Sequence, residues 1–270
     1  MQKQQIRKCA VIGRPINHSL SPMIHHHFAN QCGIALTYEK ILGDEKEFKK
    51  QVIDFFDNHG CGLNVTLPFK EQAYQLAKES QNFAVQAKSA NTLYLDADGQ
   101  ICVANTDGIG LLFSLQRTIH LENKHLLILG AGGAVRGVLP ILQQQPLASI
   151  TVANRSQDKL QKLQTDFPDI NTILFANLTQ SYDVVINGTS SSLQNQVPDI
   201  PDQVVQGSFV LDMAYDLLRD TAFMRFALEN GAQQTVDGLE MLIGQAAEAF
   251  KIWHGITVAP IYTLQACFQR

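Results

Sequence analysis

The chain has 270 residues, of which 45% are hydrophobic and 17% charged, and its formal net charge is -4. This balance is typical of globular proteins and provides no strong positive field for nucleic acid or an anionic membrane surface. The opening residues lack the features of a secretory signal, and no apolar run reaches the roughly 18 residues of a membrane span. We therefore predict a cytoplasmic protein of two domains, with neither nucleic-acid nor membrane partners.

Cysteine and histidine patterns indicate neither a disulfide framework nor a metal site. The five cysteines are widely spaced and form no CxxC pair: Cys9, Cys32, Cys61, Cys102 and Cys267. We expect them to be reduced. Three histidines follow one another at 25–27. Adjacent positions of a helix point in different directions, so these side chains are not expected to converge on one ion.

In the first part of the chain, short apolar runs alternate with helical segments. Strands are predicted at 9–12, 36–41 and 62–65, and helices near Ser21, over 45–59 and after Pro68. This alternation is typical of βαβ units with a largely parallel sheet. A hairpin follows at 91–95 and 101–104, because the turn at 96–99 contains an Asp-Gly step. We expect the hairpin to close the first domain.

A second series follows the hairpin. Strands are predicted at 125–129, 149–153, 172–175, 184–186 and 209–212. Helices are predicted at 107–118 and 134–144, and a third follows the strand at 149–153 and ends at about residue 167. These five strands with their helices are typical of a Rossmann nucleotide-binding domain. A last helix is predicted at 239–254, and its composition fits either domain.

Small residues follow the first strand of this second series, where the chain turns into a helix. They are Gly130, Ala131, Gly132, Gly133 and Ala134. Small side chains let the backbone approach a pyrophosphate, and the helix N-terminus presents N–H groups and a positive dipole end to it. A glycine cluster alone also fits an ordinary turn.

The end of the next strand favours NADP over NAD. Enzymes that bind NAD place an acidic residue there for the ribose hydroxyl, whereas this chain has Asn154, Arg155 and Ser156. A guanidinium can hold the additional phosphate of NADP through two parallel hydrogen bonds. Lys159, one turn further, is another candidate cation. Alternatively, both cations are ordinary solvated side chains.

Polar residues also gather at the strand ends of the first domain, where open α/β sheets bind ligands. Asn64 lies at the end of one predicted strand and Thr66 and Lys70 follow it, whereas Asn91 begins the hairpin and Asp107 follows it. Each has an ordinary alternative: Asp107 can cap the helix that begins there, and a lysine such as Lys70 is usually solvated.

Eight motifs occur in the order seen in shikimate dehydrogenases, and the chain resembles this family from about residue 13 to 254. The motifs are HSLSP at 18–22, NVTLPFK at 64–70, SANTL at 89–93, NTDG at 105–108, GAGGA at 130–134, NRS at 154–156, NGTS at 187–190 and DGLEMLIGQA at 237–246. Three positions depart from the usual family wording: Ala90, Ser192 and Glu240. None of them removes a group that the chemistry needs.

The resemblance implies a fold and an activity. It implies an N-terminal α/β substrate-binding domain with a mostly parallel sheet (1–106, completed by 239–270), a Rossmann NADP-binding domain (107–238), and a cleft between them. The implied protein is an NADP-dependent oxidoreductase acting on a CH–OH group. It reversibly reduces 3-dehydroshikimate to shikimate in the shikimate pathway of aromatic amino acid and chorismate biosynthesis. Such an enzyme is expected to be a monomer or homodimer whose partner is a small-molecule substrate.

The resemblance also implies roles for individual residues. Lys70 and Asp107 would be the catalytic pair. The substrate carboxylate would be bound by Ser19, Ser21 and Tyr215. The ring hydroxyls would be held by Asn64, Thr66, Asn91, Asp107 and Gln245. NADP would be bound by Gly130, Ala131, Gly132, Gly133, Ala134, Asn154, Arg155, Ser156, Lys159, Thr189, Met213 and Gly238.

Three alternatives remain open at the level of the sequence. One is a quinate/shikimate dehydrogenase with relaxed NAD or NADP preference, against which Arg155 argues. The second is a non-catalytic shikimate-binding homologue, which would be expected to have lost Lys70 or Asp107. The third is a Rossmann enzyme of folate or tRNA-reductase type, which does not account for HSLSP together with DGLEMLIGQA.

Overall fold

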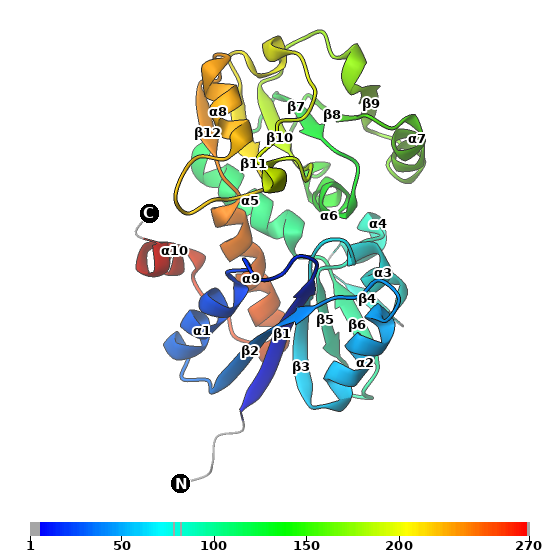
Figure 1. Ribbon diagram of the computed structural model, residues 1–270, viewed down its shortest axis with the longest axis vertical. Coiled ribbons are helices and arrows are strands. Elements are labelled where there is room, and N and C mark those ends of the chain that lie inside the picture. The colour runs from blue at the N-terminus through cyan, green and yellow to red at the C-terminus, as the bar shows by residue number, and fades with distance from the viewer. Residues whose placement is uncertain (1–5, 78, 82, 269–270) are drawn as a thin grey trace. The chain divides into compact units, whose positions relative to one another are not determined.

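The computed structural model describes residues 6–77, 79–81 and 83–268, and the chain divides into two compact units (Figure 1). The first unit is Met1–Gly110 with Leu242–Arg270, and the second is Leu111–Met241. Each unit is built around one six-stranded sheet. The unit boundaries fall inside two helices, α5 (Asp107–Thr118) and α9 (Leu239–His254).

The sheet of the first unit has the strand order β2-β1-β3-β5-β6-β4. Its strands are β1 (Arg7–Gly13), β2 (Leu36–Leu42), β3 (Gly60–Val65), β4 (Glu79–Gln81), β5 (Thr92–Leu95) and β6 (Ile101–Ala104). β1 pairs in parallel with β2 and β3, and β4 with β6, whereas β5 is antiparallel to both neighbours. The expected mostly parallel sheet is therefore confirmed, with β5 as the exception.

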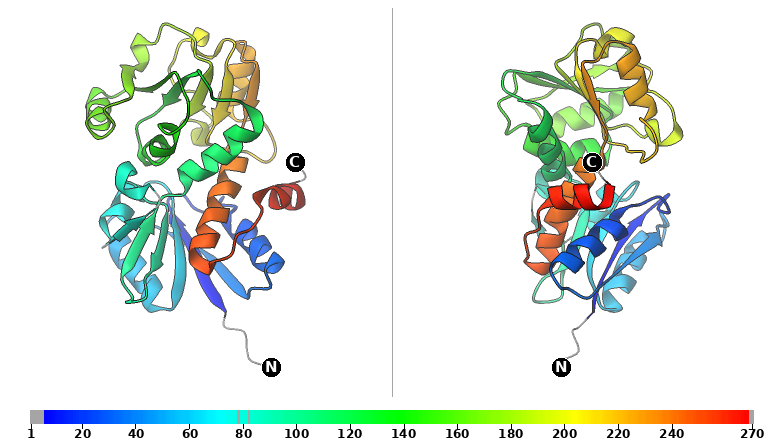
Figure 2. Two further views of the ribbon diagram at one scale, coloured as in Figure 1. Left: turned by 180° about the vertical axis from the view of Figure 1, so that it is seen from behind. Right: turned by 90° about the vertical axis from the view of Figure 1, so that its left-hand side faces the viewer.

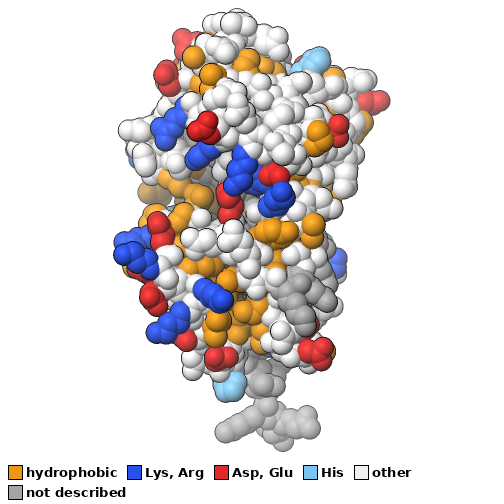
Figure 3. All heavy atoms as spheres, turned by 90° about the vertical axis from the view of Figure 1, so that its right-hand side faces the viewer, with side chains coloured by type: hydrophobic (Ala, Val, Ile, Leu, Met, Phe, Trp, Pro, Cys, Tyr) orange, Lys and Arg blue, Asp and Glu red, His pale blue; other side chains and the backbone are white. Residues whose placement is uncertain are grey.

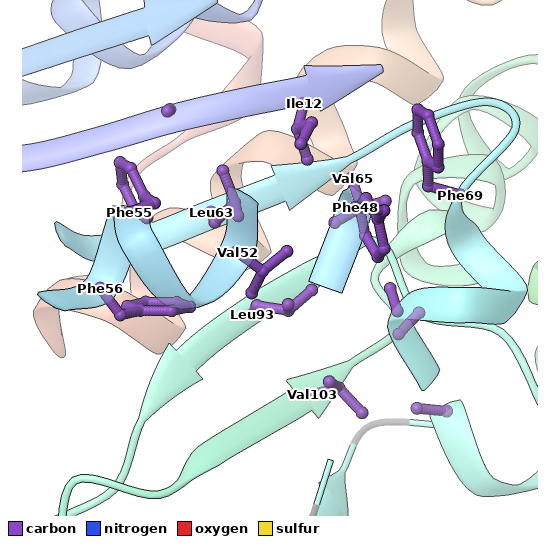
Figure 4. Close-up of a cluster of buried hydrophobic side chains, with 14 residues drawn as sticks. Ile12, Phe48, Val52, Phe55, Phe56, Leu63, Val65, Phe69, Leu93 and Val103 are labelled. Atoms are coloured by element: carbon purple, nitrogen blue, oxygen red, sulfur yellow. The ribbon is translucent and has the colours of Figure 1, made fainter. Parts of the chain in front are cut away.

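Side chains of β1 alternate between two hydrophobic clusters, because successive residues of a strand point to opposite faces. Ala10 and Ile12 belong to the cluster in Figure 4, which contains four residues of α2 (Phe48–Asp57). Cys9 and Val11 pack with residues of α9, including Trp253. Helices therefore cover both faces of this sheet.

The remaining helices of the first unit are α1 (Ser21–Gln31), α3 (Lys70–Gln75), α4 (Ala84–Ala87) and α10 (Pro260–Phe268). α10 lies against α1 (Figure 2). Neither α4 nor α10 is predicted from the sequence. The helix predicted at 45–59 is shorter, because Asp44 Oδ1 accepts the N–H groups of Lys46 and Glu47 and holds the chain in a turn before α2.

The sheet of the second unit is entirely parallel, with the order β12-β11-β10-β7-β8-β9. Its strands are β7 (His125–Leu129), β8 (Ser149–Asn154), β9 (Asn171–Leu174), β10 (Val184–Asn187), β11 (Phe209–Asp212) and β12 (Gln234–Val236). Counted from β7, this is the order 3-2-1-4-5-6 of Rossmann domains. The sequence predicts five strands, and the sixth is the three-residue β12, which pairs with β11 at one edge.

Helices α6 (Gly133–Leu142), α7 (Gln157–Asp166) and α8 (Ala222–Glu229) accompany this sheet. Three short 3-10 helices occupy Phe175–Asn177, Ser192–Gln194 and Asp202–Val205. α8 is not predicted from the sequence. It begins where Thr221 accepts the Met224 N–H, and its Phe223 packs in the hydrophobic core of the unit.

The surface carries charges of both signs. On the face drawn in Figure 3, Lys and Arg side chains lie among Asp and Glu side chains without a region of a single sign. This agrees with the small net charge of -4. In the described part of the chain, no helix is long and apolar enough to cross a membrane.

Candidate functional site

The centre of the candidate site is a buried ion pair between the first residues of two helices. Lys70 begins α3, Asp107 begins α5, and Lys70 Nζ lies 2.7 Å from Asp107 Oδ2. Lys70 is 9% and Asp107 4% exposed. A buried ammonium and carboxylate of this kind are stable only when both are paired, because removing either leaves an uncompensated charge. The ordinary alternative of a solvated lysine is therefore wrong.

Asn91 holds the other carboxylate oxygen of Asp107. Its Nδ2 donates to Asp107 Oδ1 over 2.8 Å, and its Oδ1 accepts the backbone N–H of Thr106 over 2.9 Å. The second bond fixes which way the amide points, because only oxygen can accept. Asn91 Nδ2 also lies 3.2 Å from Gln245 Oε1. Asp107 is thus held between two donors, one on each oxygen.

Asn105 explains why Asp107 is not needed as a helix cap. Asn105 Oδ1 accepts the Asp107 N–H over 3.1 Å, and its Nδ2 donates to Ser89 O over 2.8 Å. The start of α5 is therefore stabilised by Asn105, which leaves the Asp107 carboxylate to Lys70 and Asn91. Sequence reasoning could not separate the two roles, because both residues have side chains that cap helices.

The side chain of Asn64 connects Tyr38 to the backbone of Asn91. Its Nδ2 donates to Asn91 O over 3.1 Å, and its Oδ1 accepts the hydroxyl proton of Tyr38 over 2.7 Å. Sequence reasoning missed Tyr38, which lies in the middle of β2 as an ordinary buried strand residue. The pairing of β2 with β1, and of β1 with β3, brings it to Asn64.

The loops after β1 and β3 carry the other polar residues predicted in the first unit. Ser19 Oγ donates to Ser21 Oγ over 3.2 Å, and Ser21 is the first residue of α1. Thr66 follows β3 and donates its N–H to Ile12 O. A Cβ on Gly13 would lie 2.2 Å from Thr66 Cγ2, so the approach of these two loops requires a glycine.

The three adjacent histidines have different environments, as expected from their helical positions. His25 is fully buried and contacts the rings of Tyr38 and Trp253, with ring centroids 4.6 and 5.1 Å away. His26 is exposed and contacts Pro22 O, whereas His27 contacts Gln31. Over the described ranges, no three His, Cys, Asp or Glu side chains are grouped so that they could hold a metal ion.

Acid is expected to destabilise the first unit through His25. Burial, and then the nearby His254, lower the pKa of His25 to about 3, whereas an unfolded histidine titrates near 6.5. Between about pH 6.5 and pH 3, His25 therefore binds a proton in the unfolded chain but not in the folded protein, and this difference favours unfolding. The wild type should lose about 2–3 kcal/mol more unfolding free energy than His25→Phe between about pH 6.5 and pH 4.5. Denaturant titrations at both pH values measure this difference.

The control is His120→Gln, because His120 is exposed and is not among the groups that shift the pKa of His25. Its pH dependence should equal that of the wild type. An equal pH dependence in His25→Phe and the wild type would contradict the assignment to His25.

In the second unit, the glycine loop lies between β7 and α6. Gly130 has φ +107°, and a Cβ there would lie 3.2 Å from the Gly188 backbone, so this turn requires glycine. A Cβ on Gly132 would meet no atom within 4 Å, which leaves the backbone accessible directly before α6 begins at Gly133. Ala131 and Ala134 are half-buried beside it.

The residues after β8 lie at the start of α7. Asn154 is buried at the end of the strand, and Arg155 is exposed. Ser156 caps α7 by accepting the Lys159 N–H over 3.5 Å, while the Lys159 side chain is exposed. This segment adjoins the glycine loop, since Gly130 donates its N–H to Ala153 O. An exposed guanidinium can bind an anionic group.

A buried carboxylate, missed by sequence reasoning, organises the loops after β10 and β11. Asp212 accepts hydrogen bonds from Asn187 Nδ2, Ser192 Oγ and Thr221 Oγ1. Burial raises the pKa of Asp212, and these hydrogen bonds partly offset the shift. Asn187 Oδ1 in turn accepts the N–H and the hydroxyl proton of Thr189. The carboxylate thereby links the NGTS motif to the segment that contains Met213.

The remaining predicted residues lie close to this segment. Met213 donates its N–H to Asn187 O, and Gly238 donates its N–H to Ala214 O. A Cβ on Gly238 would lie 2.1 Å from Met213 O, so the contact requires glycine. Tyr215 follows as a half-buried residue.

Three family models match the chain. The shikimate dehydrogenase substrate binding domain matches residues 11–93, shikimate / quinate 5-dehydrogenase matches residues 114–240, and the shikimate 5'-dehydrogenase C-terminal domain matches residues 238–261. Together these matches extend over most of the chain. They agree with the order of motifs in the sequence.

Individual proteins are similar over nearly their full length. The shikimate dehydrogenase (NADP(+)) of Legionella pneumophila (strain Lens) is 50% identical, covering 93% of this chain and 94% of that protein. The structure of shikimate dehydrogenase from Aquifex aeolicus has a TM-score of 0.86 and 31% identity, covering 99% of both chains. That of Thermus thermophilus shikimate 5-dehydrogenase, in complex with NADP(H) and shikimate, has a TM-score of 0.85 and 26% identity, covering 97% of this chain and 99% of that chain.

Proposed function

The chain belongs to the shikimate dehydrogenase family, and we propose that it catalyses the reversible, NADP-dependent reduction of 3-dehydroshikimate to shikimate in the shikimate pathway. The observation that carries this proposal is the buried Lys70–Asp107 pair, with Asn91 on the second oxygen of the carboxylate. A homologue that only bound its ligand would have no need for a buried ammonium, which is costly to maintain.

Reduction of a ketone requires a hydride at the carbonyl carbon and a proton at the oxygen. NADPH, when bound, supplies the hydride. Lys70 supplies the proton and stabilises the negative charge that develops on the oxygen. One N–H of Lys70 is directed to Asp107, which leaves two for the substrate. Asp107 keeps the ammonium oriented and accepts hydrogen bonds from substrate hydroxyls.

The other polar residues bind and orient the substrate. Ser19, Ser21 and Tyr215 hold the carboxylate, because hydroxyl groups can donate hydrogen bonds to it. Amide and hydroxyl side chains hold the ring hydroxyls, and they are Asn64, Thr66, Asn91 and Gln245. The hydrogen bonds of Asn64 to Tyr38 and Asn91 support this role, since they restrict the orientation of its amide before substrate binds.

The second unit fits NADP. The open backbone at Gly132 and the N-terminus of α6 suit the pyrophosphate, and Arg155 suits the 2'-phosphate. The cofactor is bound by Gly130, Ala131, Gly132, Gly133, Ala134, Asn154, Arg155, Ser156, Lys159, Thr189, Met213 and Gly238. Hydrogen bonds through Asn187 support the positions of Thr189 and Met213.

Replacing Arg155 with alanine is expected to raise the KM for NADP by about 10- to 100-fold, because a charge-assisted hydrogen bond contributes roughly 1.5–3 kcal/mol. The KM for NAD should change little, since NAD lacks the 2'-phosphate. Steady-state kinetics with both cofactors measures the two values. Arg225→Ala, at an arginine of α8, is the control. Equal losses for NADP and NAD would argue against a phosphate contact.

The activity itself is tested by following reduced-cofactor absorbance in four assays, with shikimate or quinate as substrate and NADP or NAD as cofactor. Rapid NADP reduction with shikimate alone is the expected result. Equal rates with quinate or NAD would favour a quinate/shikimate dehydrogenase of broader specificity. No reduction by folded protein in any assay would contradict the proposal and favour a binding role.

The organisation of the protein follows from the same proposal. Residues 1–106 with 239–270 form the substrate-binding domain, and 107–238 form the NADP-binding domain. We further propose that the enzyme is cytoplasmic and acts as a monomer or homodimer on small molecules. Size-exclusion chromatography with light scattering distinguishes the two oligomeric states.

A further inference from the structure

Two cysteines lie in contact on neighbouring strands of the first unit. Cys9 is on β1, Cys61 is on β3, and their Sγ atoms are 3.3 Å apart although the residues are 52 positions apart in the chain. Both are free thiols. The pair belongs to no part of the proposed catalytic machinery, since the site residues follow the carboxyl ends of these strands and the cysteines lie near their amino ends.

An irregularity in strand pairing brings the thiols together. Lys8 pairs with Gly60 whereas Cys9 pairs with Gly62, so Cys61 is the extra residue on β3. Residues that are directly adjacent along a regular strand point to opposite faces, and a bulge changes this direction locally. Both Cys9 and Cys61 consequently pack in the hydrophobic cluster beneath Trp253 of α9.

We propose that Cys9 and Cys61 form a redox-sensitive modification site, at which a hydroperoxide converts the two thiols into an intramolecular disulfide. A disulfide has an S–S distance of about 2.05 Å, so the sulfur atoms must approach by roughly 1.3 Å from their present separation. Rotation of the two side chains and a small shift of the bulged residue provide this movement.

The chemistry is a two-electron oxidation with peroxide as the oxidant. The Cys61 thiolate attacks one peroxide oxygen, the O–O bond breaks, and the departing hydroxide takes up a proton to form water, leaving a sulfenic acid. The Cys9 sulfur then attacks the Cys61 sulfur and loses its proton, while the sulfenic oxygen leaves as a second water. Two thiols are oxidised to one disulfide, and hydrogen peroxide is reduced to two waters.

The exposure of the two residues determines their order of reaction. Cys9 is completely buried, whereas Cys61 is partly exposed and is the thiol that peroxide can reach. The Cys9 S–H group and the positive charge of Arg7 lower the pKa of Cys61 despite the opposing effect of burial. The hydrogen bond to Cys61 and burial raise the pKa of Cys9. Cys61 is therefore the attacking thiolate, and Cys9 resolves the sulfenic acid.

The experiment uses the reduced full-length protein, treated with a small molar excess of hydrogen peroxide. After unfolding under acid quench, the number of free thiols should fall from five to three, and the intact mass should fall by two hydrogen atoms. Peptide mapping should identify a Cys9–Cys61 cross-link that dithiothreitol removes. Stable oxygen addition at Cys61 without a cross-link, or a cross-link between other cysteines, would overturn the proposal.

Three variants sharpen the test. In Cys61→Ser, the number of free thiols should not fall by two on peroxide treatment. Cys32→Ser, the matched control, should still form the Cys9–Cys61 cross-link. Cys9→Ala lacks the resolving thiol, so its Cys61 sulfenic acid should persist and react with dimedone. If Cys9→Ala does not fold, Cys61→Ser decides the matter, because its partly exposed side chain tolerates serine. Loss of a thiol pair in Cys61→Ser equal to that in the wild type would overturn the proposal.

Discussion

Lys70→Met is expected to lower kcat for shikimate oxidation by roughly 10³-fold, with a smaller change in KM, because general acid–base catalysis contributes about 10²–10⁴-fold. Methionine has similar length and fills the same volume, but it can neither carry a proton nor stabilise charge on the substrate oxygen. Initial rates with saturating NADP measure kcat. Lys50→Met, at an exposed lysine of α2, should behave as the wild type.

Stability must be measured beside activity, because Lys70→Met leaves the buried Asp107 without its cation. Breaking a buried pair in this way costs about 3–5 kcal/mol. Lys70→Arg restores a positive charge, but a guanidinium does not release its proton near neutral pH. We therefore expect Lys70→Arg to recover stability without recovering kcat. Near-normal turnover by either variant would show that Lys70 does not transfer the proton.

Asp107→Asn is expected to lower kcat by about 10²-fold, because an amide cannot accept from both of its neighbours. Lys70 Nζ donates to one oxygen of Asp107, and Asn91 Nδ2 donates to the other. Whichever way the new amide points, its NH₂ group faces a donor. Misalignment of Lys70 follows, and steady-state kinetics with shikimate should detect it. Asp98→Asn, at an exposed turn position, is the control.

A double-mutant cycle tests whether Lys70 and Asp107 act as one unit. If they do, Lys70→Met with Asp107→Asn should be little slower than Lys70→Met alone, because each single change already disables the pair. Losses in kcat that multiply across the two sites would mean that the residues contribute independently, and would refute the proposed role of Asp107 as the partner that orients Lys70.

Elements with a strong local pattern could be predicted from the sequence. The bounds of α5, β7, β11 and α9 agree with the prediction, since each combines regular apolar spacing with a clear start or end. The three-residue strands β4 and β12 carry too little pattern, and form because an adjacent strand offers free hydrogen-bonding groups. Pairing with a neighbour is a property of the fold, not of the segment.

The candidate site divides in the same way. The sequence by itself determined the polar residue types at the strand ends and the motif order of the family, and it placed Arg155 at the position where a phosphate contact is proposed. Only the tertiary structure decided that Asn105 stabilises the start of α5 while Asp107 pairs with Lys70, and that Tyr38 orients Asn64. The bulge that brings Cys9 and Cys61 into contact likewise depends on the register of β1 and β3. Composition and spacing specify local groups, whereas burial and strand register determine which distant groups meet.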